Sequence, residues 1–371
     1  MKQFLFATTA IVAFTGAAAA DVNISGLAEM GIVGGDEDNT AGDGDVEFFT
    51  DIDVTFTLAG ATDTGLTYGA SIDLDESDDA EAFDARDQGG ENIFISGGFG
   101  TLTMGDTDGA IDWALAEVGF DATSINDDHE HGGWNGNAAL DGVFDGQILR
   151  YDYTIGDFGV AISGEVDDNS NDGSDPILGI GLRGSFDFAG NAIGFGIGYQ
   201  TGSEGSGVQD VVESAGGFTT TTTSDFADED REAFGASLNG TFGVFEVGVT
   251  YTNFDNNNQA AVTTTVVDDA NPAAPPTTNT VISGTDDSGE HYGIGVGYNA
   301  GPLSLHANYG EYDFDDGSDR SGFGVTAGYE LGEDVEVQLG YGHTDGRGAG
   351  AADSDFFNDG DSFSFGVAMS F

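Results

Sequence analysis

The chain alternates between apolar residues and small or polar residues over almost its whole length of 371 residues. The last eleven residues show this best, because Phe363, Phe365 and Val367 are separated by single small residues in the run that ends at Phe371. A side-chain period of two is that of a β-strand, whose successive side chains point to opposite faces. Each strand is therefore predicted to carry one apolar face and one face of glycine, serine, threonine and aspartate.

The connectors between the alternating segments are of two kinds. About seven are short turns and about eight are long loops, and the two kinds alternate along the chain. About fifteen connectors imply about sixteen strands, with both chain ends on the short-turn side. The long connectors 201–230 and 255–288 carry a run of five threonines and a proline cluster, respectively. They are predicted to be surface excursions, exposed and free to vary.

The apolar faces must be covered either by a second sheet or by lipid. A soluble sandwich has to fill its centre, whereas the other face of these strands is small and polar. Short turns at one rim, long loops at the other and aromatic residues at strand ends are typical of outer-membrane barrels. An open sheet in lipid would leave its edges unpaired, so the sheet must close. The predicted fold class is an all-β transmembrane antiparallel β-barrel of about sixteen strands, with short periplasmic turns and long external loops.

The amino-acid composition excludes several classes of protein and of site. The chain has 67 acidic and seven basic residues, a formal charge of −60 and no cysteine. Nothing in it could neutralise nucleic-acid phosphates, and disulfides or cysteine-ligated metals are excluded. With 39% apolar residues and 28 phenylalanines, the chain is too apolar for a disordered acidic protein. No internal run of about 18 apolar residues exists, so helical membrane spans are excluded.

The first twenty residues have the pattern of a secretory leader. Lys2 precedes an apolar run over 4–14, and small alanines follow at 17–20. A basic start, an apolar middle and an Ala-x-Ala end indicate a cleaved signal peptide. Residues 1–20 are therefore predicted to be removed, and residues 21–371 to form a single barrel domain.

Three segments carry a resemblance to a known family: 21–26 (DVNISG), 100–110 (GTLTMGDTDGA) and the terminal Phe371. The chain resembles the general porins of Gram-negative bacteria, closest to those of purple photosynthetic and related alphaproteobacteria. The resemblance implies a homotrimer in the outer membrane, in contact with lipid and lipopolysaccharide. It implies a channel for passive diffusion of small hydrophilic solutes and ions, with no enzymatic activity, and a third long loop, about 107–145, folded into the lumen. Phe371 resembles the signal read by the barrel assembly machinery.

The predicted constriction is acidic. On the parity of their strands, three aspartates also point inward as part of the pore wall: Asp51, Asp53 and Asp73. The constriction acids are Asp106, Asp108, Asp112, Glu117 and Asp121. Carboxylates lining a narrow water path concentrate cations and repel anions, so the channel is expected to prefer cations. The alternative for any single acid is an ordinary solvated loop charge.

The arginines are informative about the pore because the chain has few of them. Arg150 and Arg183 have inward parity, as have Arg231 and Arg320 at strand ends. An arginine facing lipid is costly, so inward placement is also the default for stability. The resemblance assigns Arg150 and Arg183 to the wall opposite the acidic loop, and their small number argues against strong anion passage.

Other functions remain open at this stage. The motif His129-Glu130-His131 could bind a metal, although histidines in such a loop are more often just exposed. No cofactor is predicted, whereas Ca²⁺ or Mg²⁺ could bridge the acidic external loops. The alternatives to a general porin are a secreted, acidic, calcium-binding structural or adhesive β protein and a solute-specific porin. The second would need an aromatic track in the lumen, for which Trp113, Phe120 and Trp134 are candidates.

Overall fold

The computed structural model describes most of the chain outside the first twenty residues and several long connectors. The described residues are 21–35, 46–75, 88–120, 124–144, 146–166, 175–203, 208–215, 218–226, 230–255, 260–268, 277–283, 288–347 and 359–371. The predicted leader, 1–20, and the predicted constriction residue Asp121 lie outside them.

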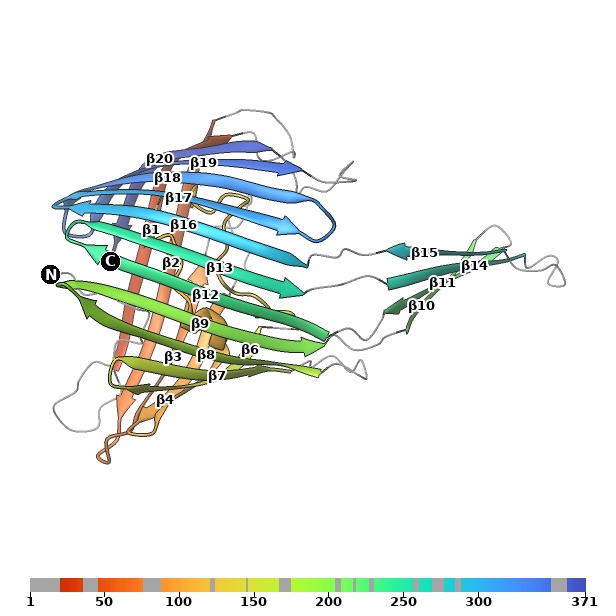
Figure 1. The fold of residues 1–371 in the computed structure, drawn as a ribbon, viewed down its shortest axis with the longest axis horizontal. Coiled ribbons are helices and arrows are strands. Elements are labelled where there is room, and N and C mark those ends of the chain that lie inside the picture. Colours follow the sequence, from red (N-terminus) through yellow and green to blue (C-terminus); the bar gives the residue numbers. More distant parts are fainter. Residues whose placement is uncertain are drawn as a thin grey trace.

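Sixteen strands form a closed antiparallel barrel (Figure 1). The barrel closes where β1 pairs with β20, for example at Gly31 and Gly366, which confirms the predicted fold class. The barrel strands are β1 (Asp21–Gly35), β2 (Glu47–Ala61), β3 (Thr67–Asp75), β4 (Gln88–Gly97), β5 (Gly100–Asp106), β6 (Gln147–Ile155), β7 (Phe158–Glu165), β8 (Asp175–Phe188), β9 (Asn191–Ser203), β12 (Asp230–Phe242), β13 (Phe245–Asp255), β16 (Gly289–Ala300), β17 (Leu303–Phe314), β18 (Asp319–Gly332), β19 (Val335–Arg347) and β20 (Gly360–Ser370).

The two faces of the barrel strands follow the parity of the sequence. On β20, Phe365 is 50% exposed, whereas its neighbour Ser364 is 2% exposed. The same holds on β16, where Ile294 and Val296 are exposed on the outside. Large apolar side chains therefore cover the outer surface instead of meeting in a dry interior, which is the arrangement expected of a barrel surrounded by lipid.

Short turns and both described chain ends lie at the same end of the barrel (Figure 1). Several of these turns place a glycine at positive φ, for example Gly156, Gly190 and Gly243. Glycine adopts this conformation without the steric penalty of a Cβ atom. The glycines therefore explain how the chain can form short turns at these positions.

The connectors 201–230 and 255–288 hold four strands that the alternation pattern did not predict. They are β10 (Val208–Ala215), β11 (Phe218–Phe226), β14 (Ala260–Asp268) and β15 (Thr277–Ser283). These form a separate four-stranded sheet in the order β10-β11-β14-β15, beyond the long-loop end of the barrel (Figure 1). β11 and β14, from different connectors, pair with each other. The prediction of plain surface excursions was therefore incomplete.

One short helix, α1 (Ala110–Ala114), occurs among the described residues. None of the helical structure in the described residues is long and apolar enough to span a bilayer. The buried apolar side chains gather between this helix and the inner wall, and they include Ile111, Leu115 and Ile177. The core is therefore a layer beneath one loop, on one side of the lumen.

Candidate functional site

The connector between β5 and β6 lies inside the barrel, and we call its described residues, 107–120, 124–144 and 146, the lumen loop. Its contacts with the wall fall on β6–β9, β12, β13, β16–β20 and β1. In barrel order, β2–β5 make up the remaining sector. The free edge of the lumen loop therefore faces β2–β5 across the lumen.

Wall glycines make room for the backbone of the lumen loop. A Cβ on Gly181 would lie 2.0 Å from the Ala110 carbonyl oxygen, and a Cβ on Gly295 would lie 2.0 Å from that of Val118. No real Cβ could be accommodated at such distances without a shift of the loop. The inward glycines of the alternating strands thus form a wall surface without side chains, against which the loop backbone packs.

Arg150 on β6 holds the start of the lumen loop. Its Nη1 donates a hydrogen bond of 2.5 Å to the Asp108 carbonyl oxygen. The carboxylates of Asp108 and Asp152 each lie 3.7 Å from a guanidinium nitrogen of Arg150. This inward arginine is therefore flanked by two acids.

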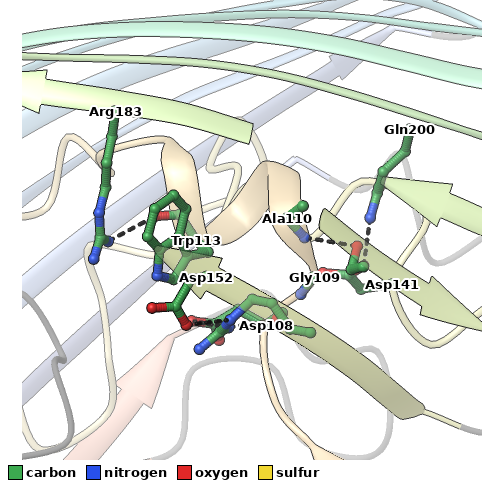
Figure 2. Close-up of polar contacts among 10 residues, drawn as sticks. Asp108, Gly109, Ala110, Trp113, Asp141, Asp152, Arg183 and Gln200 are labelled. Carbon is green, nitrogen blue, oxygen red and sulfur yellow. Dashed lines mark hydrogen bonds and ion pairs between the residues drawn. The ribbon is translucent and has the colours of Figure 1, made fainter. Parts of the chain in front are cut away.

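Arg183 on β8 holds the helix of the lumen loop (Figure 2). Its Nη1 donates to the Trp113 carbonyl oxygen at 2.8 Å, and its guanidinium carbon lies 3.8 Å from the centroid of the Trp113 ring. Arg150 and Arg183, two of the four arginines predicted to point inward, therefore both hold the lumen loop against the wall.

The end of the lumen loop returns to its own beginning. The Asp141 carboxylate accepts hydrogen bonds from the Gly109 N–H at 2.6 Å and from the Gln200 side-chain amide at 2.5 Å (Figure 2). The Gln200 Oε1 in turn accepts the Leu140 N–H at 3.0 Å. Burial raises the pKa of Asp141 to about 6, and the two hydrogen bonds oppose that rise.

Glu165 on β7 anchors the last residues of the lumen loop. Its carboxylate accepts the N–H groups of Gly142 at 3.0 Å, Phe144 at 3.2 Å and Gly146 at 2.9 Å. The Glu165 side chain is 2% exposed. Three charge-assisted hydrogen bonds to otherwise unpaired backbone donors make it the principal anchor of this end.

Acidic groups cluster along the first part of the lumen loop. Burial raises the pKa of the Asp112 carboxyl to about 8, reinforced by repulsion from Asp108, Asp141 and Glu117 and opposed by Arg150. The predicted residues Asp108, Asp112 and Glu117 are therefore brought together, but Asp112 is mostly protonated at neutral pH.

A second group of acidic residues lies where the lumen loop approaches strands β1 and β2. Burial raises the pKa of Asp127, and the neighbouring carboxylates Asp128 and Asp51 raise it further. Glu29 on β1 interacts electrostatically with Asp51, Asp53 and Asp127. The predicted wall acids Asp51 and Asp53 thus face a loop acid, and Glu29 joins them although it was not predicted.

The other two predicted acids are placed differently. Asp73 on β3 accepts a hydrogen bond of 3.0 Å from the Thr55 hydroxyl on the inner wall. Asp106, at the end of β5, lies on the exposed side shared with Leu102 and Met104 and accepts the Gly90 N–H at 2.9 Å. The structure therefore does not bring Asp106 to the acids around Arg150.

The histidines of the His129-Glu130-His131 motif are buried. The sequence had favoured exposed histidines in this loop. His129 is 7% exposed and His131 is 4% exposed. Among the described residues, no group of three or more His, Cys, Asp or Glu side chains is suited to hold a metal ion. Inward parity could have identified Glu165, Gln200, His291 and His306, but nothing in the sequence indicates that they contact the loop.

Comparisons with known proteins agree with this architecture. The family model for Gram-negative porins matches residues 7–349. A porin of Rhodobacter capsulatus is 33% identical over 190 residues, which are 47% of this chain and 55% of that relative. The chain therefore spans about half the length of this curated relative.

Solved structures of porins share the fold. A porin refined at 1.8 Å matches with a TM-score of 0.59 and 20% identity. A triple mutant of the Rhodopseudomonas blastica porin matches with a TM-score of 0.59 and 16% identity. A loop-deletion mutant of a Vibrio cholerae outer membrane protein matches with 0.57 and 16%. Each covers 95% of this chain and 100% of the matched chain.

The family match extends over most of the chain, and the closed barrel of sixteen strands with a loop inside it agrees with that match. The resemblance inferred from the sequence is thereby confirmed. The chain belongs to the family of Gram-negative porins, which are channels and not enzymes.

Proposed function

We propose that the protein is a passive diffusion channel of the bacterial outer membrane that admits small hydrophilic solutes and ions and prefers cations. The observation that carries this proposal is the imbalance of charge beside the lumen loop. Arg150 is flanked by Asp108 and Asp152, and Arg183 is bound to the Trp113 carbonyl. Glu29, Asp51 and Asp127 place further carboxyl groups beside the lumen loop.

The size of the expected preference follows from Coulomb's law. A unit charge at ~7 Å in water contributes roughly 0.6 kcal/mol before screening. About four such groups give about 2 kcal/mol, a bias of some tens-fold that salt then reduces. The preference is therefore expected to be weak at high ionic strength and clear at low ionic strength.

Removing acids on the two sides of the water path should weaken the preference. In Asp51→Asn and Asp127→Asn, each lost charge is expected to lower the cation-to-anion permeability ratio by about threefold at low salt. The reversal potential of a planar bilayer under a KCl gradient measures this ratio. Asp361→Asn, on the outer face beside Tyr341, is the matched control. A wild-type anion preference would refute the proposed selectivity.

The cation preference should increase as the pH rises from 6 to 9. The folded pKa of Asp112, about 8, is above its ordinary value of 3.8, so Asp112 gains its charge within this interval. The same raised pKa means that the loop is more stable with Asp112 protonated and loses that stability as the pH rises through about 8.

Reversal potentials measured over this pH range check the prediction, and Asp112→Asn should remove the alkaline step. Asp316→Asn should not, because hydrogen bonds from Ser318 lower the pKa of Asp316 and keep it ionised throughout. An alkaline step of equal size in Asp112→Asn would contradict the assignment.

The remaining features of the proposal rest on the family. They are a homotrimer, contact with outer-membrane lipid and lipopolysaccharide, export through a cleaved leader over 1–20, and assembly through Phe371. The single barrel domain with a constriction loop at about 107–145 belongs to the same proposal, as do divalent cations on the acidic external loops. Chelation should lower the melting temperature of the trimer at low salt if Ca²⁺ or Mg²⁺ bridges these loops.

A solute-specific channel is less well supported by the packing of the candidate aromatic residues. The Trp113 ring lies beneath Arg183. Phe120 and Trp134 make edge contacts with His306 and His129, respectively. The Trp113 and Phe120 rings are thus engaged between the loop and the wall, and the Trp134 ring packs within the loop. These contacts do not support an aromatic track for a substrate.

A further inference from the structure

Four of the five histidines of the chain lie together between the lumen loop and the wall. We call His129, His131, His291 and His306 the imidazole cluster. Their exposed fractions lie between 1% and 7%. The first two belong to the lumen loop, and the other two come from β16 and β17. The His129 and His306 ring centroids are 6.2 Å apart.

The two wall histidines hold the lumen loop through its backbone. The His291 Nε2 lies 3.0 Å from the Gly133 carbonyl oxygen, and the His306 Nε2 lies 2.9 Å from the Val118 carbonyl oxygen. A carbonyl can only accept, so Nε2 carries the proton in both rings. The Nδ1 atom of each ring is buried without a hydrogen-bond partner among the described residues.

Each of the two loop histidines also has a buried ring nitrogen without a hydrogen-bond partner among the described residues. The His131 Nδ1 accepts the Gly133 N–H at 3.0 Å, so its proton is on Nε2, which is buried without a partner among the described residues. The His129 Nδ1 is likewise buried without such a partner. A second proton on His129, His291 or His306 would create a buried donor with nothing to accept from it, and on His131 it would break the bond from Gly133.

The surroundings do little to favour a charged ring. Burial lowers the pKa of His131 to about 3, and the other three histidines and Arg320 lower it further. Burial also lowers the pKa of His129, although Asp128 partly opposes this. The other titratable or charged groups that face the cluster are Glu130 on the loop and Tyr312 on β17.

We infer that His291 and His306 are positioning residues that hold the lumen loop against the wall only while the imidazole cluster is neutral, so that acid releases this part of the loop into the lumen. The inference rests on the proposed channel function for its effect on conductance. The sign follows from linkage: groups whose pKa is lower in the folded state lose stability as pH falls below their ordinary value of about 6.5. Because the wall lies behind the loop, a released loop moves inward and narrows the water path.

Tryptophan fluorescence reads the release directly, since the chain has two tryptophans and both lie on the lumen loop. In a Trp113→Phe background, Trp134 is the sole reporter, with its ring centroid 5.2 Å from that of His129. Acrylamide quenching of the detergent-purified full chain is expected to rise between pH 6 and pH 4. Over the same interval, single-channel conductance in a planar bilayer should fall by about twofold.

The decisive variant is His291→Gln with His306→Gln, because glutamine keeps an N–H donor but does not titrate. The quenching and conductance transitions should both move to lower pH by about one unit, since fewer protons then drive release. His343→Gln is the matched control, because the His343 ring bonds Asp361 on the outer face. All variants keep the carboxylates of the lumen loop, so acid effects on those groups are common to all.

The outcomes separate the two claims. A quenching transition that is absent in wild type, or that His291→Gln with His306→Gln leaves in place, would overturn the inference. If the double variant does not fold, His306→Gln alone should give a smaller shift in the same direction. A protein that shows the quenching transition but conducts no ions at pH 7 would contradict the proposed function while leaving the positioning role intact.

Discussion

Gly295→Ala is expected to reduce single-channel conductance by about half, because the new methyl group pushes the lumen loop into the water path. Its Cβ would lie 2.0 Å from the Val118 carbonyl oxygen and 3.0 Å from the Val118 carbonyl carbon. A backbone contact cannot rotate away as a flexible side chain can. The same carbonyl accepts the hydrogen bond from His306, so the displacement also loosens that attachment.

Overpacking of this kind costs about 1–3 kcal/mol, and the melting temperature of the protein should fall accordingly. The control lies two residues further along the same strand. A Cβ on Gly297 would approach only side chains, at 3.3 Å from the Glu246 carboxylate and 3.6 Å from the Phe120 ring. Gly297→Ala should therefore be nearly neutral, and equal conductance losses in the two variants would show that the loop does not rest on Gly295.

Glu165→Ala is expected to free the returning end of the lumen loop. The substitution removes the acceptor of three backbone N–H groups, from Gly142, Phe144 and Gly146. Hydrogen bonds to charged groups contribute about 1.5–3 kcal/mol each, and water entering the gap recovers part of that. A net loss of about 3 kcal/mol is expected from thermal or denaturant unfolding.

Electrical recordings should show the consequence as larger open-channel current fluctuations, since the loop end then samples several positions. Glu336→Gln provides the comparison, because the Glu336 carboxylate is on the inner wall but bonds Ser304 and Gln338 rather than the loop. Unchanged stability and quiet recordings in Glu165→Ala would contradict the anchoring role.

The barrel was predictable because its physical cause is local. The alternation that ends at Phe371 places each apolar side chain outward wherever the strand is regular, and Ser364 and Phe365 take the two faces as expected. Inward parity likewise placed Arg150 and Arg183. Asp106 does not join the other predicted constriction acids, because it continues the alternation of β5 and lies on the exposed side shared with Leu102 and Met104.

The contacts of the lumen loop were not predictable, because they join residues far apart in the chain. Glu165 and Gln200 look like any other polar residues of the inner wall until the loop backbone meets them. The His129-Glu130-His131 motif has the composition of an exposed loop, and burial comes only from its position against β16–β19. Strands β11 and β14 were not predicted because their threonine runs give no apolar–polar contrast. Strands β10 and β15 lack a regular alternation of apolar and polar residues.

The pairing of β11 with β14 bears on the order in which the molecule assembles. Thr222 pairs with Thr264, and the hairpin of β12 and β13 separates the two in the chain. Once that hairpin has formed, the stretch of free chain to be closed is much shorter, and the entropic cost of bringing β11 to β14 falls with it. We therefore expect the sheet of β10, β11, β14 and β15 to form after the hairpin of β12 and β13, as a slow and separable phase of refolding.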